Sequence, residues 1–254
     1  MILINYKNIP LTVKHSPGDN RDYTLKTFGV DINTENEDDY TVPHLPNVYS
    51  QGNSGECLYF SIAGIKESQE LEERGVRVRY SPSYLYAIRE EDDYKGEGGH
   101  PREALKMAQK FGICEFDDFP YVGTYIEAKN LLDKRFVELL PKALPQRIKS
   151  YGRLDINNID EVKTAIKKFG VCVISIEVFG SFFKTGADGI VTQVNIGEKS
   201  YGGHAMELVG WKKINGQLHW KVLNSWDKSW GDNGYCYIPR NYSCLLYTSP
   251  SPRD

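Results

Sequence analysis

Apolar positions recur at helical spacing through the first half of the chain. Within residues 55–74, Leu58, Ile62 and Ile65 lie three or four residues apart, and a glycine follows the segment. The same spacing predicts three more helices, two of them with a proline at the first helical position: one beginning at Pro82, one from Pro101 to about Gly112, and one over 126–140 closed by Pro141. We therefore expect a helical lobe over residues 46–145.

The pattern changes after about residue 150. One helical stripe remains, between Val162 and Phe169. Five runs rich in β-branched and aromatic residues follow, separated by turn residues: 171–178, 189–194, 204–211, 218–226 and 234–239. These runs predict antiparallel strands in a β-barrel lobe over residues 146–243, so the fold class is α+β with two lobes. The polar, weakly periodic residues 1–45 are expected to form an N-terminal arm or leader.

Composition excludes several classes of function. Of the 254 residues, 40% are hydrophobic and 26% charged, which is typical of a globular protein with its own core. A formal net charge of −3 gives no basic footprint, so we expect no nucleic-acid partner. No apolar run has the length of a membrane span or of a signal-peptide core, so we expect no membrane association. These features favour a cytoplasmic monomer, of cellular or viral origin.

The cysteines predict neither a metal site nor a disulfide framework. There are five of them, an odd number, and no two have the CxxC spacing. Cys172 and Cys236 lie in strand-like runs and are interpreted as buried thiols, the commonest state of a free cysteine. We expect no metal, no cofactor and a reducing compartment.

The last eleven residues differ in composition from the rest of the chain. The stretch CLLYTSPSPRD, residues 244–254, resembles the translation of a sequencing-library adapter from an environmental sample. Its serine and proline content would also fit a disordered tail. We expect residues 244–254 to be non-native and to make almost no packed contacts.

A cysteine stands at the start of the clearest helix, in QGNSGECLYF. The helix dipole and the unpaired N–H groups there favour thiolate over thiol, so we expect the pKa of Cys57 to lie well below about 8.5. The backbone N–H of Cys57 and the side-chain amide of Gln51 could hold the oxyanion of a tetrahedral intermediate. The structural alternative is a buried thiol that happens to begin a helix.

Three further sequence motifs follow QGNSGEC in order along the chain. GEGGHP carries Gly98 and Gly99, which leave backbone open to an extended ligand; GGHAMELVGW carries His204; and NSWDKSWGDNGY carries Asn224. Each piece alone is common in proteins without catalytic function. Their joint presence, with His204 placed 147 residues after Cys57 (204 − 57 = 147), is far more specific.

Together these motifs resemble the papain family of cysteine peptidases, over about residues 42–240. The resemblance implies the papain-like two-lobe fold, with the active site in the cleft between the lobes, and a protein or peptide substrate. It makes Cys57 the nucleophile, His204 the general base and then acid, Asn224 the residue that orients the imidazole, and Gln51 the oxyanion donor. Substrate contacts would come from Gly98, Gly99, His100, Pro101 and Gly203, while Trp226 would shield the His204–Asn224 bond from water.

Two departures from the family pattern stand beside the nucleophile. Ser54 and Glu97 occupy positions where secreted members of that family form a disulfide, which again favours a reducing compartment. Glu56 puts a carboxyl next to Cys57, which would raise the thiol pKa slightly. Two other functions stay open: a Cys-His acyltransferase or amidase of the transglutaminase kind, and an inactive papain-like binding module.

The catalytic interpretation sets a condition on one hairpin. A two-residue Asn215-Gly216 turn that pairs residue 214 with 217 would set Asn224 opposite Glu207, on the wrong face for His204. A three-residue loop with a bulge at Gly216 would instead set Asn224 opposite Met206, diagonal to His204. We therefore predict the bulged loop.

Overall fold

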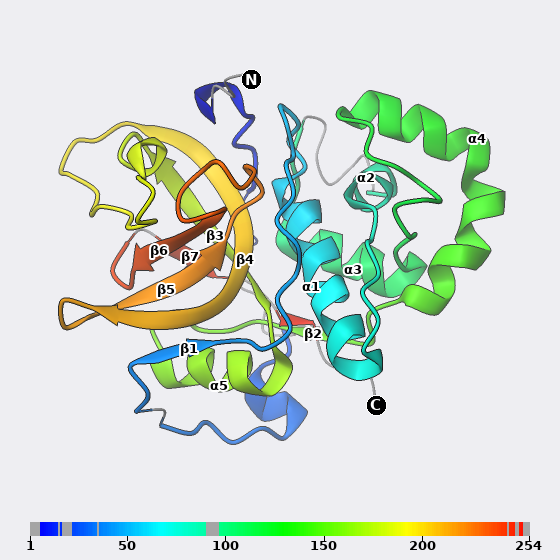
Figure 1. The fold of residues 1–254 in the computed structure, drawn as a ribbon. Helices are drawn as coiled ribbons and strands as arrows, with labels where there is room; N and C mark the ends of the chain where they lie inside the picture. The colour runs from blue at the N-terminus through cyan, green and yellow to red at the C-terminus, as the bar shows by residue number, and fades with distance from the viewer. Residues whose placement is uncertain are drawn as a thin grey trace.

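In the part of the chain that the structure describes, four α-helices lie before residue 144 and a fifth lies in the second half (Figure 1). The computed structural model describes residues 6–14, 16, 22–34, 36–89, 97–242, 244–246 and 249–250. The helices have these bounds: α1 Cys57–Arg74, α2 Pro82–Ala87, α3 Pro101–Phe111, α4 Tyr125–Ala143 and α5 Ile159–Phe169. Side chains cap three of them, because Ser81, Thr124 and Asn158 each accept a bond from the backbone amide of the third residue of α2, α4 and α5, respectively.

Helix α1 lies at the centre of the molecule. Figure 1 shows it between the curled sheet and helices α2, α3 and α4. Every residue of α1 from Cys57 to Glu70 is buried, so the helix is covered on all sides rather than along one stripe. Its exposed last turn ends at Gly75, which adopts the left-handed conformation that favours glycine.

Helix α4 runs further than the sequence predicts. The expected end before Pro141 is wrong, since α4 continues to Ala143. The missing N–H of Pro141 leaves the Val137 carbonyl without its helical donor. Val137 is 87% exposed, so water can take the donor's place.

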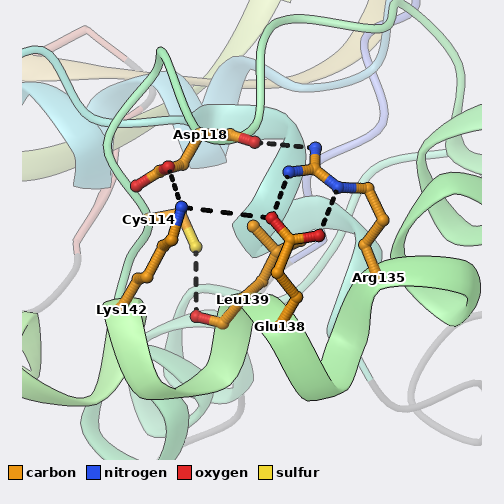
Figure 2. A network of polar contacts seen from close by, with 6 residues as sticks. All are labelled: Cys114, Asp118, Arg135, Glu138, Leu139 and Lys142. Atoms are coloured by element: carbon orange, nitrogen blue, oxygen red, sulfur yellow. Dashed lines mark hydrogen bonds and ion pairs between the residues drawn. The ribbon is translucent and has the colours of Figure 1, made fainter.

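A polar network fastens α4 to the loop before it (Figure 2). Lys142 lies 2.5 Å from a carboxylate oxygen of Asp118, and Arg135 pairs with Glu138 at 2.7 Å while donating to the Asp118 carbonyl at 2.9 Å. The Cys114 thiol, fully buried, points to the Leu139 carbonyl at 3.7 Å. The ion pairs are largely exposed and contribute little free energy, but together they fix the orientation of the helix.

The second half of the chain forms an antiparallel sheet with the strand order β6-β5-β4-β3-β7. Its centre is the 15-residue strand β4, which pairs with β3 along its first part and with β5 along its second. The strands have these bounds: β1 Asp39–Thr41, β2 Tyr151–Gly152, β3 Cys172–Phe179, β4 Ser200–Ile214, β5 Gln217–Leu223, β6 Tyr235–Pro239, β7 Cys244–Leu246 and β8 Ser249–Pro250. The α+β fold expected from the sequence, a helical lobe beside a curled antiparallel sheet, is confirmed.

The β4–β5 hairpin meets the catalytic condition by a route that the sequence did not predict. The three-residue bulged loop is wrong: Ile214 pairs with Gln217 across a two-residue turn, with both Asn215 and Gly216 at positive φ (50° and 79°). The extra residue lies instead inside β4, where the register shifts between Leu208 and Gly210. Beyond this bulge Glu207 pairs with Leu223, so the next residue, Asn224, comes opposite Met206 as the site requires.

Residues beyond 243 also take part in β-pairing, β7 in the main sheet and β8 in a separate two-stranded sheet. Strand β7 pairs with β3 and strand β8 with β2, so the expectation of almost no contacts is wrong for these two segments. The non-native origin of residues 244–254 remains a prediction, as do the lobe boundaries at 46–145 and 146–243. Within the described residues no helix is long and apolar enough to cross a membrane.

Candidate active site

The loop before α1 presents Cys57 at the first position of the helix. Gly52 turns the chain with a positive φ of 55°, and Glu56 occupies the N-cap position without making a side-chain cap. In the first turn the amides of Tyr59 and Phe60 donate to the Glu56 carbonyl at 2.9 Å, while those of Cys57 and Leu58 interact with the Cys57 thiol and favour its anionic form. Cys57 is fully buried.

The histidine and the asparagine come from neighbouring strands and meet directly. His204 Nε2 lies 2.7 Å from Asn224 Oδ1, and the same oxygen accepts the Ser225 backbone N–H at 2.9 Å. Because Oδ1 is an acceptor in both contacts, Nε2 carries the proton and Nδ1 carries the lone pair. Nδ1 has no hydrogen-bond partner among the described residues, although His204 is fully buried. The arrangement leaves one basic nitrogen available for a proton.

The sulfur of Cys57 lies close to the backbone of the residue that follows this histidine. The backbone amide of Ala205, the residue after His204, interacts with the thiol and favours its anionic form. The helical lobe thus brings the thiol close to the part of β4 that carries the imidazole. A thiol beside a lone-pair nitrogen held by a third group is the arrangement expected of an activated nucleophile.

Trp226 covers the imidazole. Its ring centroid lies 4.9 Å from that of His204, and the indole is 1% exposed. Phe183 stacks on the indole at 5.7 Å, and Tyr6 from the N-terminal arm stacks on it at 5.4 Å. This aromatic group separates His204 from solvent and strengthens its hydrogen bond to Asn224, because the local dielectric is low.

Gln51 is held on both sides of its amide. Its Nε2 donates to the Ser54 carbonyl at 2.7 Å, and its Oε1 accepts the Ser225 hydroxyl at 2.6 Å. Ser225 follows Asn224, so one residue pair ties the loop of the helical lobe to the end of β5. One of the two Nε2 hydrogens remains for a ligand near Cys57. The Gln51–Ser225 contact could not be found from sequence, since 174 residues separate the partners.

A segment of the N-terminal arm occupies the cleft beside these residues. The Val13 amide donates to the Gly203 carbonyl at 3.1 Å, and the Lys14 amide donates to the Gly99 carbonyl at 3.1 Å. Residues 11–14, here called the cleft segment, therefore run between the glycines of the helical lobe and those of the sheet, parallel to both. Sequence reasoning placed Gly98, Gly99 and Gly203 at this cleft but not the arm.

These glycines are needed for the close approach of the backbones. A Cβ on Gly98 would lie 2.3 Å from the Thr12 carbonyl oxygen, and one on Gly203 would lie 2.0 Å from that of Val13. His100 and Pro101 follow directly and begin α3, with Pro101 buried and His100 half-buried. The part of His100 and Pro101 in a substrate pocket stays a prediction.

Burial decides the charge state of the covered site. Burial raises the pKa of the Cys57 thiol to about 11, although nearby backbone amides act to lower it. Burial also lowers the pKa of His204 to about 4, although its bond to Asn224 acts the other way. With the cleft segment in place the pair is a neutral thiol and a neutral imidazole. The thiolate expected from the sequence is wrong for this covered state.

The fold and the site together define a class: a two-lobe protein with a helix-start cysteine facing a histidine–asparagine pair. The family model described as papain family cysteine protease matches residues 34–252, so the chain belongs to the papain family. Cathepsin K of Mus musculus is 29% identical over 199 residues, and a cysteine protease of Blomia tropicalis is 28% identical over 210 residues. The alignments cover 78% and 79% of this chain, and 57% and 60% of the two relatives.

The chain thus spans under two thirds of the length of these relatives. Among solved structures, xylellain, a cysteine protease from Xylella fastidiosa, superposes with a TM-score of 0.80 at 18% identity, covering 100% of both chains. Digestive procathepsin L 3 of Tenebrio molitor gives a TM-score of 0.70 at 20% identity, over 98% of this chain and 77% of the other. At sequence identities this low, the superpositions establish the shared fold alone.

Proposed function

We propose that the protein is a cysteine peptidase that hydrolyses peptide bonds through a thioester acyl-enzyme. The observation that carries the proposal is the His204–Asn224 bond of 2.7 Å, which leaves a lone pair on Nδ1 of the residue before Ala205, and the backbone amide of Ala205 interacts with the Cys57 thiol. Membership of the papain family supports the same assignment.

The residues suffice for each step of the reaction. Nδ1 of His204 takes the thiol proton as the sulfur of Cys57 attacks the substrate carbonyl carbon. The backbone N–H of Cys57 and Nε2 of Gln51 stabilise the oxyanion. The intermediate collapses to a thioester as His204 returns the proton to the leaving amine, and the reverse sequence with water releases the acid. Asn224 keeps the imidazole in the required tautomer throughout.

A polypeptide substrate fits the cleft. The cleft segment already lies there as an extended backbone, bonded to Gly99 and Gly203 through main-chain groups alone. Main-chain recognition of this kind accepts many sequences and requires an extended chain. We further propose that the protein works as a monomer on protein or peptide substrates, in a reducing compartment such as the cytoplasm. The four described cysteines 57, 114, 172 and 236, all present as thiols, are compatible with such a compartment.

The same residues could pass the acyl group to an amine. Such an acyltransferase would form the same thioester, so acceptor choice is the only difference. Incubation of a peptide substrate with an added primary amine distinguishes the two, because hydrolysis gives the free acid and transfer gives the amide. We expect the acid to predominate.

Substitution of the nucleophile tests the proposal. Cys57→Ser should abolish cleavage of denatured polypeptides, and His204→Ala should lower kcat/KM by about 100- to 10,000-fold, the usual contribution of a general base. The control is Cys114→Ser, which alters a buried thiol that bonds to the Leu139 carbonyl away from the site and should leave kcat/KM unchanged. Cleavage by the Cys57→Ser variant would contradict the proposal. So would a wild-type chain that cleaves no polypeptide and binds a peptidyl electrophile only reversibly.

A further inference from the structure

A buried carboxyl lies directly behind the nucleophile. Glu56 is fully buried and precedes Cys57 as the N-cap residue of α1, yet its side chain makes no bond to the helix N-terminus. It turns instead toward α2, where Oε2 lies 2.9 Å from the hydroxyl of Ser83. That hydroxyl also accepts the Val122 amide at 3.1 Å, and Oε1 of Glu56 has no hydrogen-bond partner among the described residues.

The groups around this carboxyl do not compensate a negative charge. Cys57 and Tyr59 face it from α1, and Glu97 and Tyr121 face it from the loops before α3 and α4. All four are acids, so ionisation of Glu56 would place like charge among them. The Gly123 amide and the Ser83 hydroxyl favour the anion only weakly against burial. Burial therefore raises the pKa of Glu56 to about 8.

A charge at this position would act on the reaction. The N-terminus of a helix carries roughly half a positive elementary charge, which favours an anion at the first residues. A neutral carboxylic acid at the N-cap leaves that field available to the Cys57 thiolate and to the oxyanion. A carboxylate there would cancel the field and repel the thiolate.

We propose that Glu56 is a positioning residue for the nucleophile: its neutral acid leaves the start of α1 free to stabilise negative charge at Cys57, and its ionisation withdraws that stabilisation. This inference rests on the proposed function, since it concerns the same nucleophile. The only chemical change is the loss of the carboxyl proton of Glu56 to solvent as the pH rises, and no bond to carbon changes. The consequence is that Cys57 reactivity rises less steeply above about pH 8 than it would without this carboxyl.

Alkylation of Cys57 compares the two charge states. The rate of iodoacetamide labelling is measured by mass spectrometry from pH 6 to 9.5 in the wild-type chain and in Glu56→Gln, an isosteric variant that cannot ionise. The ratio of the variant rate to the wild-type rate should be near one at pH 6. It should rise to about tenfold at pH 9.5, the effect of one unit in the thiol pKa, with a midpoint near pH 8. The control is Glu72→Gln, an exposed carboxyl on the same helix, whose ratio should stay flat.

A ratio for Glu56→Gln that is constant over the pH range would overturn the inference, since a merely structural role changes the rate equally at every pH. A second measurement is independent of reactivity: the side-chain carboxyl 13C shift of Glu56 should report a neutral acid at pH 6, and a carboxylate there would also overturn it. If Cys57 is not labelled at any pH in either chain, the proposed function fails instead, and the carboxyl shift alone decides the inference.

Discussion

Single residues in the site are governed by burial rather than by their ordinary chemistry. His204 is fully buried, and its folded pKa of about 4 lies below the ordinary value of 6.5. Between these two pH values the unfolded chain binds a proton at this position that the folded chain does not. Stability contributed by the neutral imidazole is therefore present above pH 6.5 and lost as the pH falls through this window to 4.

His204→Gln should remove this pH dependence. As the pH drops from 7 to 4, the wild-type chain should lose about 3 kcal/mol of unfolding free energy relative to the variant. This figure follows from 1.36 kcal/mol per pKa unit. Urea unfolding of both chains at half-unit intervals of pH measures it. Taking the difference cancels other titrating groups, including Glu56, whose raised pKa acts in the opposite direction. A difference independent of pH would show that His204 titrates alike in both states.

At the scale of elements, the β4–β5 hairpin sets which side chains reach the site. Its two-residue turn and the bulge between Leu208 and Gly210 shift the register by one residue in total, and this shift brings Asn224 onto the face of His204. The turn places Asn215 at a φ of 50°, a conformation that asparagine tolerates and most other residues do not.

Asn215→Ala should therefore lower the free energy of unfolding by about 1 kcal/mol, the cost of a left-handed residue without asparagine's local hydrogen bonds. Thermal unfolding is the measurement, and kcat/KM should be unchanged because the strands keep their pairing. Asn215→Gly is the matched control and should be neutral or slightly stabilising. An alanine variant as stable as the wild type would favour the three-residue loop, in which residue 215 is right-handed.

At the scale of the whole molecule, the N-terminal arm lies against both lobes beside the site. The cleft segment bonds to both lobes, and Tyr6 packs on Trp226 and bonds to the Ser229 hydroxyl at 3.1 Å. Displacement of the arm would admit water to Cys57 and His204. Since burial is the largest cause of both pKa shifts, opening should lower the thiol pKa and raise the imidazole pKa, toward the thiolate–imidazolium pair that the sequence predicts.

Val13→Pro should shift the arm toward its displaced state. Proline removes the amide that donates to Gly203 and replaces a buried valine, which together weaken docking by about 1–3 kcal/mol, or five- to 150-fold in the open population. Labelling of Cys57 near pH 6 should accelerate by a comparable factor. Ile32→Ala is the control, because Ile32 lies in the same arm with 47% of its surface exposed. Equal labelling rates in Val13→Pro and the wild type would show that the arm does not limit access.

The sequence by itself determined the features that depend on neighbouring residues. Prolines at first helical positions and apolar spacing located α2, α3 and α5 from local preferences, and QGNSGEC located the start of α1 at the cysteine. The order and spacing of four motifs then indicated Cys57, His204, Asn224 and Gln51 before any of them could be placed in space. These signals are local because helix starts and turns are fixed within about one turn of the chain.

Only the tertiary structure decided the rest. The bulge inside β4 follows from pairing with β3, β1 and β5 at once, and no local preference marks its position. The charge states of Cys57, His204 and Glu56 depend mainly on their burial in the folded chain. The cleft segment pairs with glycines 86 and 191 residues away (99 − 13 = 86; 203 − 12 = 191). Burial and register are sums over contacts between distant parts of the chain, so they exist only once the chain has folded.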